Sequence, residues 1–184
     1  MDIEKELRSK LCESLSAFSS VSEEVPLTTR DGRSVRADVL AISDDNDGKV
    51  EAIAFEVKTA SGRNFQKWTE VFLQAFSYVG ATTKDGQKII SAFVYPGPPY
   101  SQYGPQGQVS EYWRDEQCPA LAGVLHMASR LNVGSGYIRS NGASEKLGLL
   151  LGPHEIWGQD HGWSPTGKKL LRSAKRQLIA GMAS

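Results

Sequence analysis

Two neighbouring segments of this sequence, residues 35–42 and 49–58, are largely apolar on both sides of an extended strand. Side chains alternate along a strand, so a segment with two apolar faces belongs inside a sheet that is covered on both sides. The chain between them, residues 44–48, reads Asp-Asp-Asn-Asp-Gly, a composition typical of a hairpin turn. We therefore expect a β-hairpin inside an α/β or α+β sandwich, with a mixed central sheet flanked by helices.

Three ionisable residues, Asp38, Glu56 and Lys58, interrupt these apolar strands. An ionised side chain without a partner is costly to bury, so we expect these groups to need one another or a ligand. The hairpin register decides whether they meet. A two-residue turn would put Asp38 and Glu56 on opposite faces, whereas a three-residue loop, residues 46–48, makes them direct neighbours on one face. Their Cβ atoms would then be about 5 Å apart, with Lys58 two residues further on.

Two carboxylates this close repel each other unless a cation lies between them. Hard divalent ions prefer oxygen ligands, so Asp38, Glu56 and a backbone carbonyl, for which Val57 is the expected donor, would hold Mg²⁺ or Mn²⁺. Such an ion polarises a phosphodiester and lowers the pKa of bound water. Lys58 would then orient or deprotonate the attacking water, or neutralise the developing phosphorane charge. The alternative is a buried Asp-Lys-Glu cluster that only fixes the register.

Sequence periodicity predicts further elements around the hairpin. Apolar residues at spacings of three and four predict helices over residues 2–18, 65–79, 119–131 and 164–180. Additional strands are expected over residues 88–95, 136–139 and 147–151. A loop is expected over residues 96–108, which are rich in proline and glycine. The apolar side of the second helix is predicted to consist of Phe65, Trp68, Phe72, Phe76 and Val79.

Bulk composition limits the class of protein. The 184 residues are most simply one domain, with an ordinary 40% of hydrophobic and 23% of charged residues. No stretch is long and apolar enough to predict a membrane span or a secretory signal. The two cysteines, Cys12 and Cys118, make neither a disulfide framework nor a zinc site, which favours a reducing cytoplasm. The 21 basic and 21 acidic residues balance, which counts against a protein that coats nucleic acid non-specifically.

Residues 37–38, Ala-Asp, followed by residues 55–58, Phe-Glu-Val-Lys, resemble the core motif of the PD-(D/E)xK nuclease superfamily. This superfamily has the restriction-endonuclease-like fold and includes restriction enzymes, archaeal Holliday-junction resolvases and RecB-type nucleases. The predicted order of helix, strand with Asp, strand with ExK, helix and strand is also that of the superfamily. Ala37 stands where the motif has proline. The resemblance covers about residues 1–95, and residues 96–184 are expected to serve the substrate or a partner.

Two further motifs resemble particular branches of the superfamily. Gln74 and Tyr78 match the QxxxY extension of the RecB-like branch, in which these residues lie beside the metal site. They are four residues apart, so they share one helix face. In resolvase-like members a Glu of the first helix adds a metal ligand, and Glu4 is the expected counterpart here, with Glu6 as its rival. An ordinary solvated helix face is the alternative for each of these positions.

The resemblance implies a Mg²⁺- or Mn²⁺-dependent nuclease that acts on DNA, with RNA not excluded, and endonucleolytic cleavage is favoured. A homodimer is compatible with it, since many relatives are dimers. Five basic residues near the C-terminus are expected to contact the phosphate backbone: Lys168, Lys169, Arg172, Lys175 and Arg176. One alternative is a non-catalytic nucleic-acid-binding or assembly module on the same fold. Another is an unrelated α/β enzyme, in which Asp38 and Glu56 would lie on opposite faces.

Overall fold

The computed structural model describes residues 2–17, 19–44, 50–58, 65–97, 119–141, 144–151 and 154–158. Within these ranges the chain forms three helices and eight strands. The helices are α1 (Ile3–Ser16), α2 (Phe65–Tyr78) and α3 (Pro119–Arg130). The strands are β1 (Ser20–Thr28), β2 (Ser34–Asp44), β3 (Val50–Val57), β4 (Thr82–Thr83), β5 (Ile89–Tyr95), β6 (Val133–Asn141), β7 (Ser144–Leu151) and β8 (His154–Gly158).

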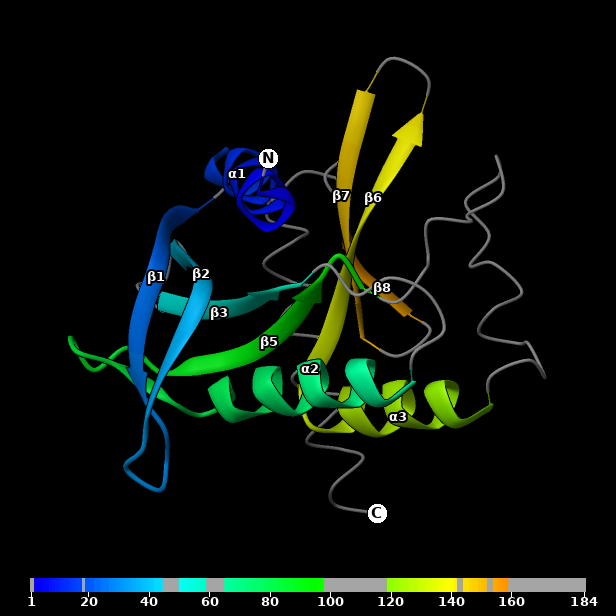
Figure 1. Cartoon of the computed structure of the whole chain (residues 1–184). Helices are drawn as coiled ribbons and strands as arrows, with labels where there is room; N and C mark the ends of the chain where they lie inside the picture. The colour runs from blue at the N-terminus through cyan, green and yellow to red at the C-terminus, as the bar shows by residue number, and fades with distance from the viewer. Residues whose placement is uncertain are drawn as a thin grey trace.

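The strands form one sheet, in the order β4-β1-β2-β3-β5-β6-β7-β8. The β3–β5 and β5–β6 pairs are parallel, and all other neighbouring pairs are antiparallel. A parallel pair requires a crossover connection, and the connections that contain α2 and α3 supply it (Figure 1). The sheet is therefore mixed and the class is α+β, which confirms the predicted mixed sheet flanked by helices.

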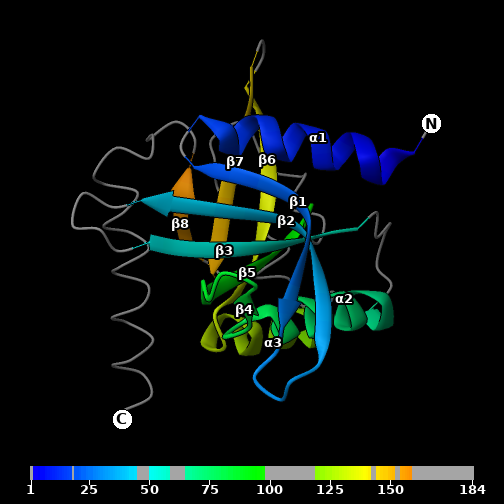
Figure 2. The ribbon, with the colours of Figure 1, turned by 90° about the vertical axis from the view of Figure 1, so that its left-hand side faces the viewer.

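Helices cover both faces of the sheet (Figures 1 and 2). α1 lies on one face, where its Leu11 and Leu15 pack with side chains such as Phe55 and Phe93. α2 and α3 lie on the other face, where residues such as Trp68 pack with small strand residues, among them Ala52, Ala54 and Ala92. Two coverings explain why the strands β2 and β3 are apolar on both sides.

The apolar face of α2 is centred on Trp68, Val71, Phe72, Ala75 and Tyr78, all of which are buried. The prediction that Phe76 belongs to this face is wrong, because Phe76 is 43% exposed. At 100° per residue, Phe76 lies at the margin of the arc that these buried residues define, on the side away from Tyr78.

Strand β1 is an element that sequence periodicity did not predict. Leu27 is the one fully buried residue among Ser20–Thr28, so the alternation of apolar and polar residues is weak. The strand also contains Pro26, which pattern rules disfavour within a sheet. It nevertheless pairs with β2 along its length and separates β2 from the two-residue strand β4.

The predicted helices over residues 2–18, 65–79 and 119–131 and the predicted strands over residues 88–95, 136–139 and 147–151 are confirmed. The expected loop over residues 96–108 lies outside the described residues apart from its first two positions. The expected C-terminal helix over residues 164–180, with its five basic residues, also lies outside them. Of the helices described, none is both long and apolar enough to cross a bilayer.

Candidate active site at the open end of strands β2 and β3

The hairpin register between β2 and β3 places Asp38 and Glu56 together. The ladder pairs Asp44 with Val50 at one end and Val39 with Phe55 at the other. One further step along the same register sets Asp38 opposite Glu56, which is the register expected from a three-residue loop. This register differs from that of a two-residue turn, which would place the two carboxylates on opposite faces.

The ladder opens at this point, because a side chain takes the place of a backbone partner. The Val57 amide donates a 2.7 Å hydrogen bond to Oδ2 of Asp38 instead of to the backbone of β2. Beyond it, the Lys58 amide donates to the Tyr95 carbonyl of β5 at 3.0 Å. Strand β3 therefore remains hydrogen-bonded to β5 while β2 separates from β3. The carboxylate of Asp38 bridges the space between β2 and β3.

Glu56 is fully buried, with an exposed fraction of 0%. One carboxylate oxygen, Oε2, accepts a hydrogen bond from the Tyr78 hydroxyl, and the Lys58 ammonium lies 3.5 Å from the other, Oε1. Oε1 makes no hydrogen bond within the described part of the chain. Burial raises the pKa of Glu56 from 4.5 to about 7, and the negative charge of Asp38 adds to the rise, whereas the Tyr78 hydrogen bond and Lys58 oppose it.

Tyr78 connects three segments at the base of the site. Its hydroxyl lies 2.9 Å from the Arg36 carbonyl and within hydrogen-bond distance of Glu56, and it accepts from the Gln74 amide at 3.3 Å. Burial, together with the nearby Glu56, raises the pKa of Tyr78 above its ordinary value, so the phenol keeps its proton. A phenol has one proton for these two acceptors. The Tyr78 hydroxyl therefore donates its hydrogen bond to Glu56 when that carboxylate is ionised. It donates to the Arg36 carbonyl when Glu56 is protonated.

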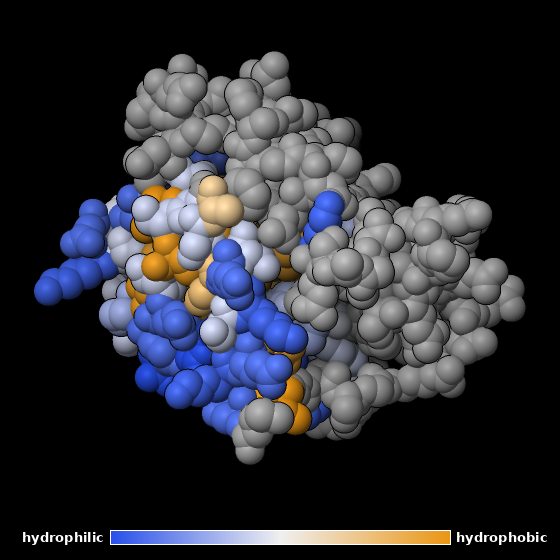
Figure 3. All heavy atoms as spheres, turned by 90° about the horizontal axis from the view of Figure 1, so that it is seen from above, coloured by the Kyte–Doolittle hydropathy of each residue, from blue (hydrophilic) through white to orange (hydrophobic). Residues whose placement is uncertain are grey.

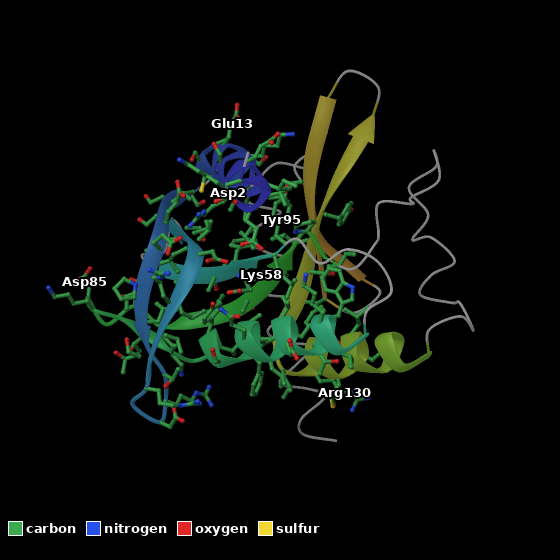
Figure 4. The ribbon with its side chains drawn as sticks, in the orientation of Figure 1. Asp2, Glu13, Lys58, Asp85, Tyr95 and Arg130 are labelled. Carbon is green, nitrogen blue, oxygen red and sulfur yellow. The ribbon has the colours of Figure 1, made fainter. Side chains whose placement is uncertain are left out.

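Helix α1 contributes Glu4 to the same site. Oε2 of Glu4 lies 3.8 Å from Nζ of Lys58, whose side chain is 34% exposed. In Figure 4 Lys58 lies between α1 and α2. Glu6, the rival candidate, forms an exposed ion pair with Lys10 at 3.7 Å instead. The structure therefore brings Glu4 to the predicted site and leaves Glu6 on the outer surface.

Asp38 and Glu56 offer carboxylate oxygens, the kind of ligand that divalent cations such as Mg²⁺ prefer. Asp38 and Glu56 lie on neighbouring strands, and the buried Oε1 of Glu56 lacks a hydrogen bond among the described residues. Buried polar atoms ordinarily have such partners, so this oxygen suits a ligand. In the described residues, no group of three or more His, Cys, Asp or Glu side chains is gathered closely enough to hold a metal. The parts assigned to the Val57 carbonyl and to Glu4 as metal ligands stay predictions.

Glu24 of β1 is a residue of this region that sequence reasoning missed. It lies opposite Asp38, between the pairs Glu23–Val39 and Val25–Ala37, and its φ of 53° is in the left-handed region. Both strands twist at this level, so that the alternation of their side chains between the two faces of the sheet is interrupted. Val39 packs on the α1 side, whereas Ala37, two residues away, packs on the α2 side. No motif in the sequence marks such a twist, because it depends on the pairing of two strands.

Comparison with family models, with curated proteins and with solved structures gave no match.

Proposed function

We propose that this protein is a metal-dependent deoxyribonuclease that hydrolyses phosphodiester bonds within DNA chains. The observation that carries the proposal is the meeting of Asp38, Glu56 and Lys58 where the β2–β3 ladder opens. Two acids on neighbouring strands and an amine beside them would be costly to gather between apolar layers for stability alone, since ion pairs in such places seldom exceed their desolvation cost. A buried carboxylate with a raised pKa, such as that of Glu56, is typical of catalytic sites.

In this proposal the carboxylates of Asp38 and Glu56 and the carbonyl of Val57 hold Mg²⁺ or Mn²⁺. When bound, the ion would polarise the phosphodiester and lower the pKa of a water molecule. Asp38 is oriented for this task by the Val57 amide. Glu56 is oriented by the Tyr78 hydroxyl, which is itself held by the Gln74 amide.

Lys58 supplies the positive charge. Its ammonium lies within 4 Å of both Glu4 and Glu56, so two carboxylates hold it in place beside the buried acid. From there it would orient the attacking water or neutralise the charge that develops on the phosphate. Glu4 holds Lys58 and is a further candidate metal ligand.

The proposed partners of the protein are DNA and a second copy of the chain. DNA is the proposed substrate, and the basic residues Lys168, Lys169, Arg172, Lys175 and Arg176 are proposed to contact its backbone. A homodimer and a cytoplasmic location complete the proposal.

A second candidate function is a non-catalytic nucleic-acid-binding or assembly module on the same fold. The ion pairs of Lys58 with both Glu4 and Glu56 favour it, because the ammonium offsets the charge of these carboxylates without a metal. A calorimetric titration with Mn²⁺ separates the two functions, since a module of this kind has no need to bind the ion.

The direct test of the nuclease is incubation with supercoiled, linear, single-stranded and branched DNA, in Mn²⁺ and in EDTA. We expect cleavage of at least one substrate in Mn²⁺ and none in EDTA. Lys58→Ala should fold normally and cleave at least about a hundredfold more slowly. Lys84→Ala is the matched control, because Lys84 is an exposed lysine near β4. Full activity in clean Lys58→Ala protein would refute the assignment.

A further inference from the structure

Arg36 of β2 has an unusual combination of fixed position and exposure. Its Nε lies 2.8 Å from Oε2 of Glu24, while 69% of its side chain is exposed. No carboxylate of the described residues pairs with its two terminal nitrogens. A guanidinium donates up to five hydrogen bonds and matches phosphate geometry, so those nitrogens remain suited to an anion.

Glu24 holds Arg36 together with a second arginine. Its other oxygen, Oε1, pairs with Nη1 of Arg8 on α1, and Arg8 is also 3.5 Å from Glu23. A left-handed backbone at a residue other than glycine costs about 1–2 kcal/mol, so the fold maintains Glu24 there against a penalty. The result is a carboxylate that lies between Arg8 of α1 and Arg36 of β2 and forms an ion pair with each.

Arg36 lies near the proposed catalytic groups. Its carbonyl accepts a hydrogen bond from the Tyr78 hydroxyl, and Asp38 lies two positions further along β2, about 7 Å along a strand. Ala37 packs on the α2 side, so alternation directs the Arg36 side chain to the α1 side.

The face of α1 that reaches Lys58 also reaches Arg36 through Glu24. Glu4 pairs with Lys58, and Arg8, four residues later on the same helix face, pairs with Glu24. One face of α1 therefore contacts Lys58 directly and the Glu24 carboxylate that pairs with Arg36. Figure 3, viewed from the α1 side, shows mainly hydrophilic side chains on much of the described surface, which suits a polar partner.

We propose that Arg36, oriented by Glu24, binds a backbone phosphate of the DNA substrate beside the phosphate that is cleaved. Glu24 is the positioning residue and Arg36 the contact. This inference rests on the proposed nuclease function, and it adds a binding residue outside the predicted motifs.

The chain offers a matched control on the same strand pair. Arg33 also pairs through Nε with one carboxylate, Asp31, at 2.7 Å, and its side chain is 72% exposed. It precedes β2, on the opposite side of Arg36 from Asp38, and no contact joins its side chain to Tyr78, Glu56 or Lys58 among the described residues. Arg33→Ala therefore removes the same charge from a similar ion pair that lies farther from the site.

The test measures binding of a short fluorescent DNA duplex and of its single strand in Ca²⁺, with cleavage in Mn²⁺ measured separately. Arg36→Ala should weaken binding about tenfold and reduce the slope of log K against log salt by about one. Its KM should rise more than its kcat falls. Arg36→Lys should retain the salt slope, because it keeps the charge. Glu24→Gln should weaken binding less than Arg36→Ala does and leave the salt slope unchanged.

The outcomes separate this inference from the proposed function. If the wild type cleaves DNA and Arg36→Ala matches Arg33→Ala in affinity and salt slope, Arg36 is no phosphate contact and the nuclease assignment stands. If the wild type neither binds nor cleaves DNA, both fall. Preferential binding of an RNA strand, with the same loss in Arg36→Ala, would overturn DNA as the ligand. A thermal melt of each variant shows whether it is folded. If Arg36→Ala does not fold, the affinity of Arg36→Lys is compared with that of the wild type instead.

Discussion

Two parts of the β1–β2 strand pair hold polar groups in different ways. At the turn, Thr29, Asp31 and Arg33 satisfy one another within five residues of sequence, and Asp31 and Arg33 are exposed. At the level of Asp38, polar groups arrive from α1, β2, β3 and α2, and Glu56 among them is fully buried. The turn needs only its own sequence, whereas the second cluster needs the whole fold. Burying polar groups that come from distant parts of the sequence costs stability. Function is expected at such sites.

The largest effect that would sharpen this contrast is expected from Glu56→Gln. The amide keeps the shape but is a poor ligand for a divalent ion, so cleavage should fall about a thousandfold and Mn²⁺ binding should weaken strongly. Without metal at pH 8, the same variant should be more stable than the wild type, because it removes a buried charge beside Asp38. Urea unfolding and Mn²⁺ calorimetry measure the two effects. A Glu56→Gln variant that is less stable than the wild type and fully active would show that the buried cluster serves stability rather than function.

The pH dependence of stability is the next effect in size. The pKa of Glu56 is about 7 in the folded chain and 4.5 ordinarily, so the folded state holds the proton more tightly. The stability this gives is complete below pH 4.5 and is lost as the pH rises to about 7. The loss is up to about 3 kcal/mol. It is measured as the difference between wild type and Glu56→Gln in EDTA, which cancels the other carboxylates. A difference that is independent of pH would contradict the raised pKa.

The smallest effects compare the two clusters directly. Tyr78→Phe leaves the Arg36 carbonyl and Glu56 without their hydroxyl partner, so it should cost about 1–3 kcal/mol of unfolding free energy. Asp31→Ala removes an exposed pair and should cost less than about 1 kcal/mol. Urea denaturation of both variants measures the comparison. Equal losses would show that the buried cluster is no more dependent on its partners than the turn.

Several parts of the fold could be predicted because their signals are local. The helix α2 has a regular 3.6-residue pattern, and β2 and β3 are apolar runs on either side of a turn composition. The acids within those runs stood out for the same reason, and strand alternation reduced their arrangement to two registers. Phe76 and β1 were missed, since the first lies at the margin of an apolar arc and the second has little burial of its own.

The sequence by itself determined the positions of the three described helices and of strands β2, β3, β5, β6 and β7. It also determined that Asp38 and Glu56 would meet if the hairpin loop had an odd length. Only the tertiary structure decided that β2 separates from β3 at Asp38, that Tyr78 reaches Glu56 and that Glu4 reaches Lys58. It also decided that Glu24 turns left-handed opposite Asp38. The physical reason is the sequence separation over which each kind of interaction acts. Periodicity and turn chemistry act between neighbours in sequence, whereas the desolvation and pairing of buried charges depend on elements that only packing brings together.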